Sequence, residues 1–147
     1  MFDPEADHHY QAAYTMVAGG VFADAARTKS HYEGKHVVRP QSDLLKHTPG
    51  INWRQERVAG FEPASNSITL EDGSKTTYDI LVVNPGLSLR FDKIEGAKEA
   101  IEDADSPVSS MYTLNGAYKT SILRESFRGG NAIFTSPPFP IKCGGAP

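Results

Sequence analysis

The sequence predicts an α/β protein, and two observations support this class. Four aliphatic residues in a row, Ile-Leu-Val-Val at 80–83, show no polar alternation, which is typical of a strand buried on both faces. Near the end of the chain, a helix-like stretch at 113–127 is followed by an apolar strand at 131–135 and then by a glycine loop. Strand, helix, strand and glycine loop follow one another in this order in α/β proteins.

The first half of the chain predicts short elements separated by helix and strand breakers. Residues 10–22 are mildly apolar and predict a short helix that ends at Gly19-Gly20. Residues 23–40 are polar and irregular, and they indicate a surface insertion. A second short helix is expected at 41–47, and the Pro-Gly pair that follows it ends it.

From residue 51 onward the pattern changes to strands. Residues 51–61 alternate and contain β-branched residues, and 67–73 predict a short strand that ends in an Asp72-Gly73 turn. The next strand, 76–86, contains the aliphatic run and ends at a Pro-Gly pair.

The last part of the chain predicts a connection and one long helix. Residues 90–110 are charged and poor in apolar side chains, which indicates a connection between elements. In the helix at 113–127, the apolar and aromatic side chains recur at helical spacing: Leu114, Tyr118, Ile122, Leu123 and Phe127. Gly129-Gly130 is expected to end this helix.

Composition excludes several classes of function. A net charge of −3 with scattered Lys and Arg gives no basic face for nucleic acid. One cysteine excludes an intrachain disulfide, and the histidines have no metal-ligand spacing, so no metal site is expected. The acidic start of the chain is not a targeting peptide, and no apolar run approaches the ~20 residues of a membrane helix.

The cysteine, Cys143, lies in the glycine loop that follows the last predicted strand. Such a loop usually opens a helix, and the positive helix end together with Lys142 would favour the reactive thiolate. The competing interpretation is a small buried apolar residue, which is the usual environment of a free cysteine.

At the start of the chain, Asp3 fits the acid that holds a ribose at the end of the second strand of a dinucleotide-binding unit. That role requires a strand, a glycine loop and a helix before it, and no GxGxxG occurs in the sequence. From the residues alone, an ordinary turn residue is therefore the other interpretation of Asp3.

Five stretches occur in the same order in a known family: FDPEADHHYQ, RVAGFEPASNSITLEDG, YDILVVNPGL, FRGGNAIFT and PIKCGGAP. In them the chain resembles the sulfide:quinone oxidoreductases of the eukaryotic, mitochondrial type. The last stretch is the most specific, because the family's sulfide-attacking cysteine stands in such a motif. The resemblance implies an incomplete flavoprotein of two Rossmann-type, FAD/NAD(P)-binding domains, with 1–90 a partial FAD-binding domain and 91–147 a linker and the start of the second.

The resemblance also implies roles for individual residues. Asp3 would hold the adenosine ribose of FAD, and Gln11 would contact the flavin nucleotide. The backbone of Val58 would meet the adenine, and Gly86 would lie in a tight turn near the cofactor. Cys143 would become persulfidated and carry sulfur beside the flavin.

The implied activity is the FAD-dependent oxidation of hydrogen sulfide, with electrons passed to ubiquinone and with the sulfur acceptor left open. By the same resemblance the protein would act at the mitochondrial inner membrane, through elements expected beyond this chain. The FAD glycine fingerprint is expected upstream and a second redox cysteine downstream, so the isolated chain is expected to be inactive. The alternatives are a non-catalytic truncated fragment and a related FAD-dependent NADH:quinone or disulfide-reductase-like enzyme.

Overall fold

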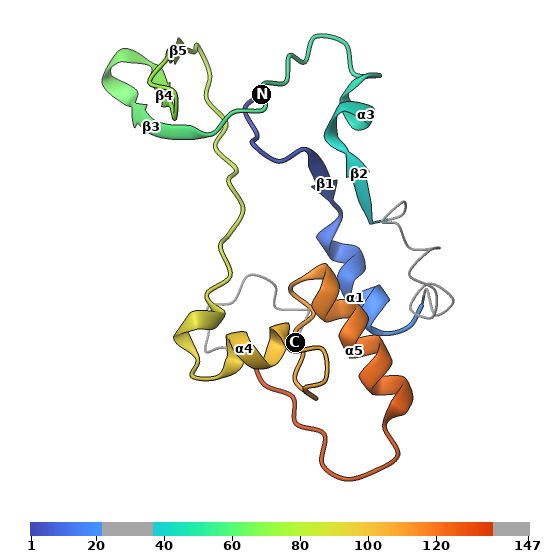
Figure 1. Cartoon of the computed structure of the whole chain (residues 1–147). Coiled ribbons are helices and arrows are strands. Elements are labelled where there is room, and N and C mark those ends of the chain that lie inside the picture. Colours follow the sequence, from blue (N-terminus) through green and yellow to red (C-terminus); the bar gives the residue numbers. More distant parts are fainter. Residues whose placement is uncertain (22–36, 137–147) are drawn as a thin grey trace. The chain divides into compact units, whose positions relative to one another are not determined.

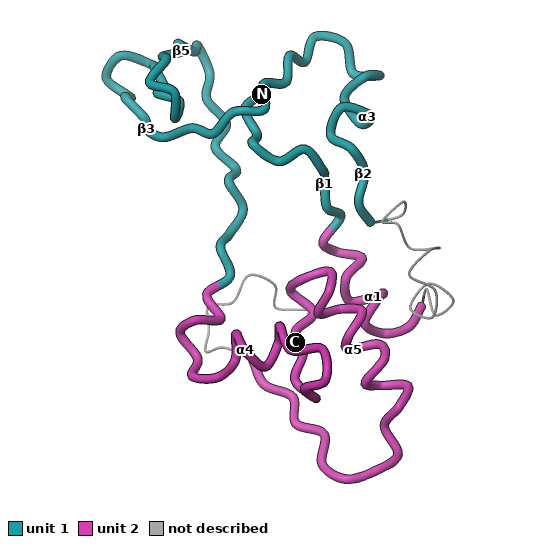
Figure 2. Tube along the Cα trace, in the orientation of Figure 1, with its two compact units in different colours: residues 1–10, 34–89 teal, residues 11–33, 90–147 magenta. Residues whose placement is uncertain are grey.

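The computed structural model describes residues 1–21 and 37–136, and these residues form a mixed α/β structure (Figure 1). The chain divides into two compact units that interleave in sequence (Figure 2). Unit 1 comprises Met1–Tyr10 and Gly34–Leu89, and unit 2 comprises Gln11–Glu33 and Arg90–Pro147. The division into two Rossmann-type domains at residue 90 stays a prediction.

Unit 1 contains a three-stranded antiparallel sheet in the order β3-β4-β5. Its strands are β3 (Val58–Glu62), β4 (Ser67–Leu70) and β5 (Lys75–Thr77), with a 3₁₀ turn η2 (Pro63–Ser65) between the first two. The central strand is buried, and Leu70 is only 2% exposed. The predicted strand at 51–61 is thus confirmed only at its end, in β3, and the predicted strand at 67–73 is confirmed in its first part, β4.

The turn between β4 and β5 follows the predicted Asp-Gly chemistry. The Gly73 amide donates to the Leu70 carbonyl oxygen at 3.0 Å, and the Leu70 amide donates to the Ser74 carbonyl oxygen at 2.9 Å. Gly73 has a φ of +83°, which is accessible to glycine at little cost. The Ser74 amide also donates to the Asp72 carboxylate at 2.8 Å, so the side chain of Asp72 closes the turn.

A second, two-stranded sheet in unit 1 joins β1 (Asp7–His9) to β2 (Val38–Pro40) in antiparallel register. The helix α3 (Gln41–Leu45) follows β2 directly, which confirms the predicted helix at 41–47. The expected insertion at 23–40 therefore ends in a strand, and residues 22–36 lie outside the described part.

The strand predicted at 76–86 forms only at its start, in β5, and the prediction that the aliphatic run at 80–83 is a buried strand is wrong. Residues 81–90 form no strand, and the side chains of Ile80 and Val82 are 86% and 85% exposed. An apolar run becomes a strand only when its N–H and C=O groups pair with a neighbour. Within residues 1–21 and 37–136, no strand pairs with this run. The prediction of a strand at 131–135 is also wrong, because these residues pair with no strand in the described part of the chain. Ile133 and Phe134 are 85% and 89% exposed.

In unit 2, helix α1 (Tyr14–Ala18) packs against helix α5 (Leu114–Ser126). A 3₁₀ turn η1 (Gln11–Ala13) leads into α1, and the amides of Gly19 and Gly20 donate to the carbonyls of its last turn. Both predicted helices are confirmed. The end of α5 at Ser126 comes before the expected Gly129-Gly130 stop.

The buried face of α5 differs from the apolar positions named above. The buried residues of the helix are small, namely Gly116, Ala117 and Ser121, whereas Ile122 and Phe127 are about half exposed. Small side chains let neighbouring backbones approach closely. A Cβ on Gly116 would collide with the Ser110 carbonyl oxygen, so this site accepts only glycine.

The charged connection at 90–110 contains two helical elements that the sequence did not predict. These are η3 (Phe91–Lys93) and α4 (Ala97–Glu102). The Lys119 ammonium on α5 donates to the backbone carbonyl oxygens of Ala100 and Asp103, at and just past the end of α4. A lysine in this position satisfies carbonyls that have no partner within the helix. Within the described ranges, no helix is long and apolar enough to cross a membrane.

Candidate functional site

The candidate site is the turn that follows the first extended residues of unit 1. Phe2 forms a parallel bridge with Arg54, and the Asp3 amide donates to the Arg54 carbonyl oxygen at 3.2 Å. The Arg54 amide in turn donates to the Met1 carbonyl oxygen at 2.9 Å. Asp3 thus directly follows an isolated parallel bridge that lies outside both sheets of the described residues.

The carboxylate of Asp3 is only partly used inside the protein. Its Oδ1 atom accepts a hydrogen bond from the Glu5 amide at 3.0 Å, which is an Asx turn. In the described part of the chain, no hydrogen bond or ion pair to Oδ2 is found. Because a carboxylate oxygen can accept two hydrogen bonds, Asp3 retains the capacity to bind a pair of hydroxyl groups.

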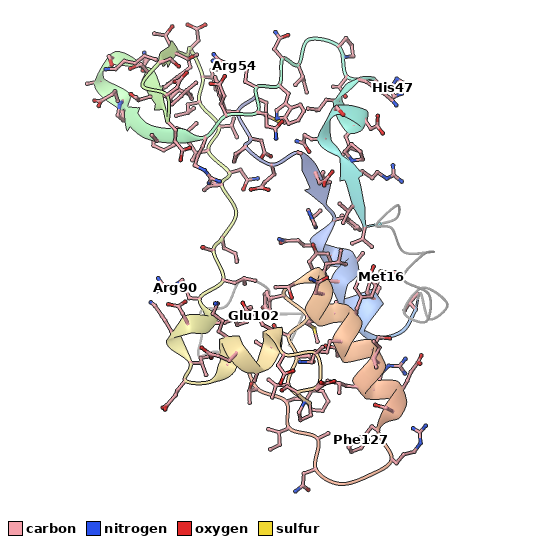
Figure 3. The ribbon with its side chains drawn as sticks, in the orientation of Figure 1. Met16, His47, Arg54, Arg90, Glu102 and Phe127 are labelled. Atoms are coloured by element: carbon pink, nitrogen blue, oxygen red, sulfur yellow. The ribbon has the colours of Figure 1, made fainter. Side chains whose placement is uncertain are left out.

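The Arg54 guanidinium is engaged by side chains other than Asp3. The guanidinium of Arg54, labelled in Figure 3, donates to both carboxylate oxygens of Glu56 at 2.8 Å. It also lies over the ring of Phe2, 5.3 Å from the ring centroid. Arg54 is therefore occupied by Glu56 and Phe2, which leaves the negative charge of Asp3 for a donor from outside.

Two other side chains hold the turn from the neighbouring segment. The indole N–H of Trp53 donates to the Asp3 carbonyl oxygen at 3.1 Å, and the Gln55 side chain donates to the Pro4 carbonyl oxygen at 3.2 Å. Neither residue was predicted from the sequence. Trp53 is the single tryptophan of the chain, and it lies in the predicted strand 51–61, so that position could have drawn attention to it.

The other residues expected at the site are distributed over both units. Val58 is the first residue of β3 and pairs with Leu70. Gly86 has a φ of +75°, consistent with the turn expected there, and no atom lies within 4 Å of the position its Cβ would take. Gln11 begins η1 in unit 2. Cys143 lies outside the described residues.

A shallow pocket of about 250 Å³ lies elsewhere in unit 1. His8 and Arg39 face each other in the register of β1 and β2, and they line the pocket together with Tyr10, Val37 and Leu44. These five residues were not predicted as a site from the sequence. Among residues 1–21 and 37–136, no group of three His, Cys, Asp or Glu could hold a metal ion.

No protein-family model matches the chain. It is similar to curated proteins named mitochondrial sulfide:quinone oxidoreductase. The relative from Dictyostelium discoideum is 35% identical over 146 residues, and that from Mus musculus is 32% identical over 145. Each match covers 99% of this chain but only 29% of the relative. A third, from Schizosaccharomyces pombe, is 33% identical and covers 95% of this chain and 28% of the relative.

Two solved structures share the fold. The X-ray structure of the sulfide:quinone oxidoreductase from the bacterium Aquifex aeolicus matches 84% of this chain and 24% of its own, with a TM-score of 0.53 and 21% identity. A chain of the Tetrahymena thermophila mitochondrial ATP synthase matches 97% of this chain and 33% of its own, with a TM-score of 0.65 and 18% identity. At these identities the likeness concerns the fold alone.

The chain spans less than a third of the length of the curated relatives it matches. Over nearly its whole length, it is related to a segment of the sulfide:quinone oxidoreductases of the mitochondrial type.

Proposed function

We propose that this chain is a segment of an FAD-dependent enzyme that oxidises hydrogen sulfide through a cysteine persulfide and passes the electrons to ubiquinone. The observation that carries the proposal is the similarity of 95–99% of the chain to three proteins named for this activity. The same names support a mitochondrial location, and we extend this to the inner membrane, where ubiquinone is dissolved.

The residues around Asp3 fit the adenosine end of FAD. Asp3 follows an isolated parallel bridge, and it has a carboxylate oxygen available, as the binding of a ribose diol requires. Gly86 has the positive φ of a turn residue. Because glycine has no side chain, a ligand can approach its backbone closely. Val58 would meet the adenine through its backbone, and Gln11 would contact the nucleotide.

Cys143 would act on sulfide. Hydrosulfide attacks a sulfur–sulfur bond between Cys143 and a second thiol; the new S–S bond is a persulfide, and the other sulfur leaves as a thiolate. Sulfide is thereby oxidised by two electrons and the original bond is reduced. The outer sulfur of the persulfide then passes to a nucleophilic acceptor, which leaves two thiols. FAD, when bound, would supply the two-electron acceptor that joins these thiols again as a disulfide, and would relay the electrons to quinone. Cys143 is the only cysteine of this chain, so the second thiol comes from outside it.

The test uses the protein expressed from its complete reading frame, with sulfide as donor and a soluble ubiquinone analogue as acceptor. Cys143→Ser should keep the yellow flavin spectrum and lose sulfide-dependent quinone reduction, because it removes the attacking sulfur. Asn115→Ala, at an exposed position of α5, serves as the matched control and should keep full activity. A preparation without flavin, or a serine variant that turns over normally, would contradict the proposal.

A further inference from the structure

The turn that carries Asp3 is fixed by three consecutive residues from a distant part of the chain. The Trp53 indole binds the Asp3 carbonyl oxygen, the Arg54 backbone binds the Asp3 amide, and the Gln55 side chain binds the Pro4 carbonyl oxygen. Both backbone polar groups of Asp3 are therefore engaged by residues about 50 positions away in the sequence.

Two local features restrict Asp3 further. Pro4 follows it, and the residue before a proline is confined to extended backbone conformations. The Glu5 amide holds Oδ1 and so selects one orientation of the carboxylate. The direction of Oδ2 then depends on the orientation of the peptide group between Asp3 and Pro4. The Trp53 indole is the side chain that holds the carbonyl oxygen of this peptide group.

Trp53 is separable from the rest of this arrangement. The parallel bridge of Phe2 with Arg54 is made by backbone hydrogen bonds, so we expect it to remain when the indole N–H is removed. The Trp53 bond is also half-buried, whereas that of Gln55 is exposed, and shielding from water strengthens a hydrogen bond. Trp53 is thus the side chain in this group that most constrains Asp3.

We propose that Trp53 is a positioning residue that aims the Asp3 carboxylate at the two hydroxyl groups of a nucleotide ribose. The inference rests on the proposed role of Asp3. It adds that Trp53 makes the Asp3 carboxylate selective for a ligand with two neighbouring hydroxyl groups. A ligand without the hydroxyl groups would not depend on the Trp53 bond.

The experiment measures the dissociation constants of the full 147-residue chain for ADP and for 2′,3′-dideoxy-ADP by calorimetry. The wild-type chain should prefer ADP about tenfold, since a hydrogen bond to a charged group contributes at least that factor. Asp3→Asn should abolish most of this preference. Trp53→Phe, which keeps an aromatic ring but loses the N–H, should reduce the preference to within about twofold of the Asp3→Asn value.

A merely structural role predicts a different result. If Trp53→Phe weakens both ligands equally and keeps the wild-type preference while Asp3→Asn loses it, this inference is overturned and the role of Asp3 stands. A wild-type chain that binds both nucleotides without any preference for ADP overturns both.

Emission from the single tryptophan gives a second readout, in case Trp53→Phe does not fold. In the wild-type chain, ADP should change the emission of Trp53, and 2′,3′-dideoxy-ADP at equal occupancy should change it much less. An emission that is the same with both ligands would overturn the inference without any variant at this position.

Discussion

Two neighbouring stretches of unit 1 have opposite outcomes, and the less apolar of the two is the one that forms a strand. The strand β4 and its partners form a sheet whose central residues are buried. The run at 80–83, which begins three residues after β5, stays extended, unpaired and exposed in the described structure. The two stretches differ in whether a nearby turn brings a partner strand alongside. Turns at η2 and at Asp72-Gly73 bring β3 and β5 alongside β4, whereas no turn beside the run returns a strand to it.

Local sequence is therefore sufficient for an antiparallel hairpin but not for a strand of parallel type. A hairpin contains its partner within a few residues, and its turn sets the register. A strand buried on both faces needs neighbours delivered by long connections. Aliphatic residues make such a strand possible, but they do not supply its hydrogen-bond partners.

The largest loss of stability should come from truncating Leu70, the buried side chain of β4. Leu70→Ala should lower the free energy of unfolding of unit 1 by about 2–5 kcal/mol, because it leaves a cavity in the sheet. The matched variant is Ile80→Ala, which removes a similar volume at an exposed position and should cost less than about 0.5 kcal/mol. Urea unfolding followed by tryptophan emission measures both. Equal losses would mean that the run at 80–83 is packed like β4.

A smaller effect on stability should come from substituting Gly73 and Gly86, two of the glycines with positive φ. Gly73→Ala should destabilise the sheet by about 1–2 kcal/mol, since an L-residue at a φ of +83° is strained in a turn that the ladder holds. Gly86→Ala introduces a side chain at a φ of +75°, where no pairing holds the backbone, and should leave the sheet intact. Neither site has an atom within 4 Å of the new Cβ, so backbone strain is the variable compared. Amide exchange of β4 is the measurement, and equal protection in both variants would contradict this account.

The smallest effect should be a dependence of the β4–β5 turn on acid. Hydrogen bonds from Ser74 hold the pKa of the exposed Asp72 carboxylate below its usual value of 3.8. A folded-state pKa below the unfolded one stabilises the fold above pH 3.8, and this contribution is lost as the pH falls through the lower value. Between pH 5 and pH 2, the midpoint temperature of thermal unfolding should therefore fall less in Asp72→Asn than in the wild type. Identical pH profiles would count against the Asp72–Ser74 contact.

The elements that the sequence predicted correctly are those with local stop and turn signals. Gly19-Gly20 ends α1, and Asp72-Gly73 connects β4 to β5. The buried face of α5 could not be predicted from its own spacing, because α5 packs against α1, which lies far away in the chain. Helix α4 was missed because its stretch is charged, and its end is held by Lys119 from another helix.

The candidate site was predictable only through the family resemblance. The local sequence around Asp3 predicts only a turn residue. Asp3 lies beside Arg54 because of a pairing between segments about 50 positions apart, which no local pattern indicates. The same holds for Trp53, whose side chain resembles an ordinary core residue until its partner is known.

The interleaving of the two units has a consequence for the order of folding. Helices α1 and α5 pack together, although the chain between them includes nearly all of unit 1. Closing so long a loop is slow and costs conformational entropy, whereas the β4–β5 hairpin closes over a few residues. On the ribosome α1 emerges first and must wait, with its apolar side uncovered, until α5 has been synthesised. Unit 2 is therefore expected to form last and to depend most on protection of the nascent chain.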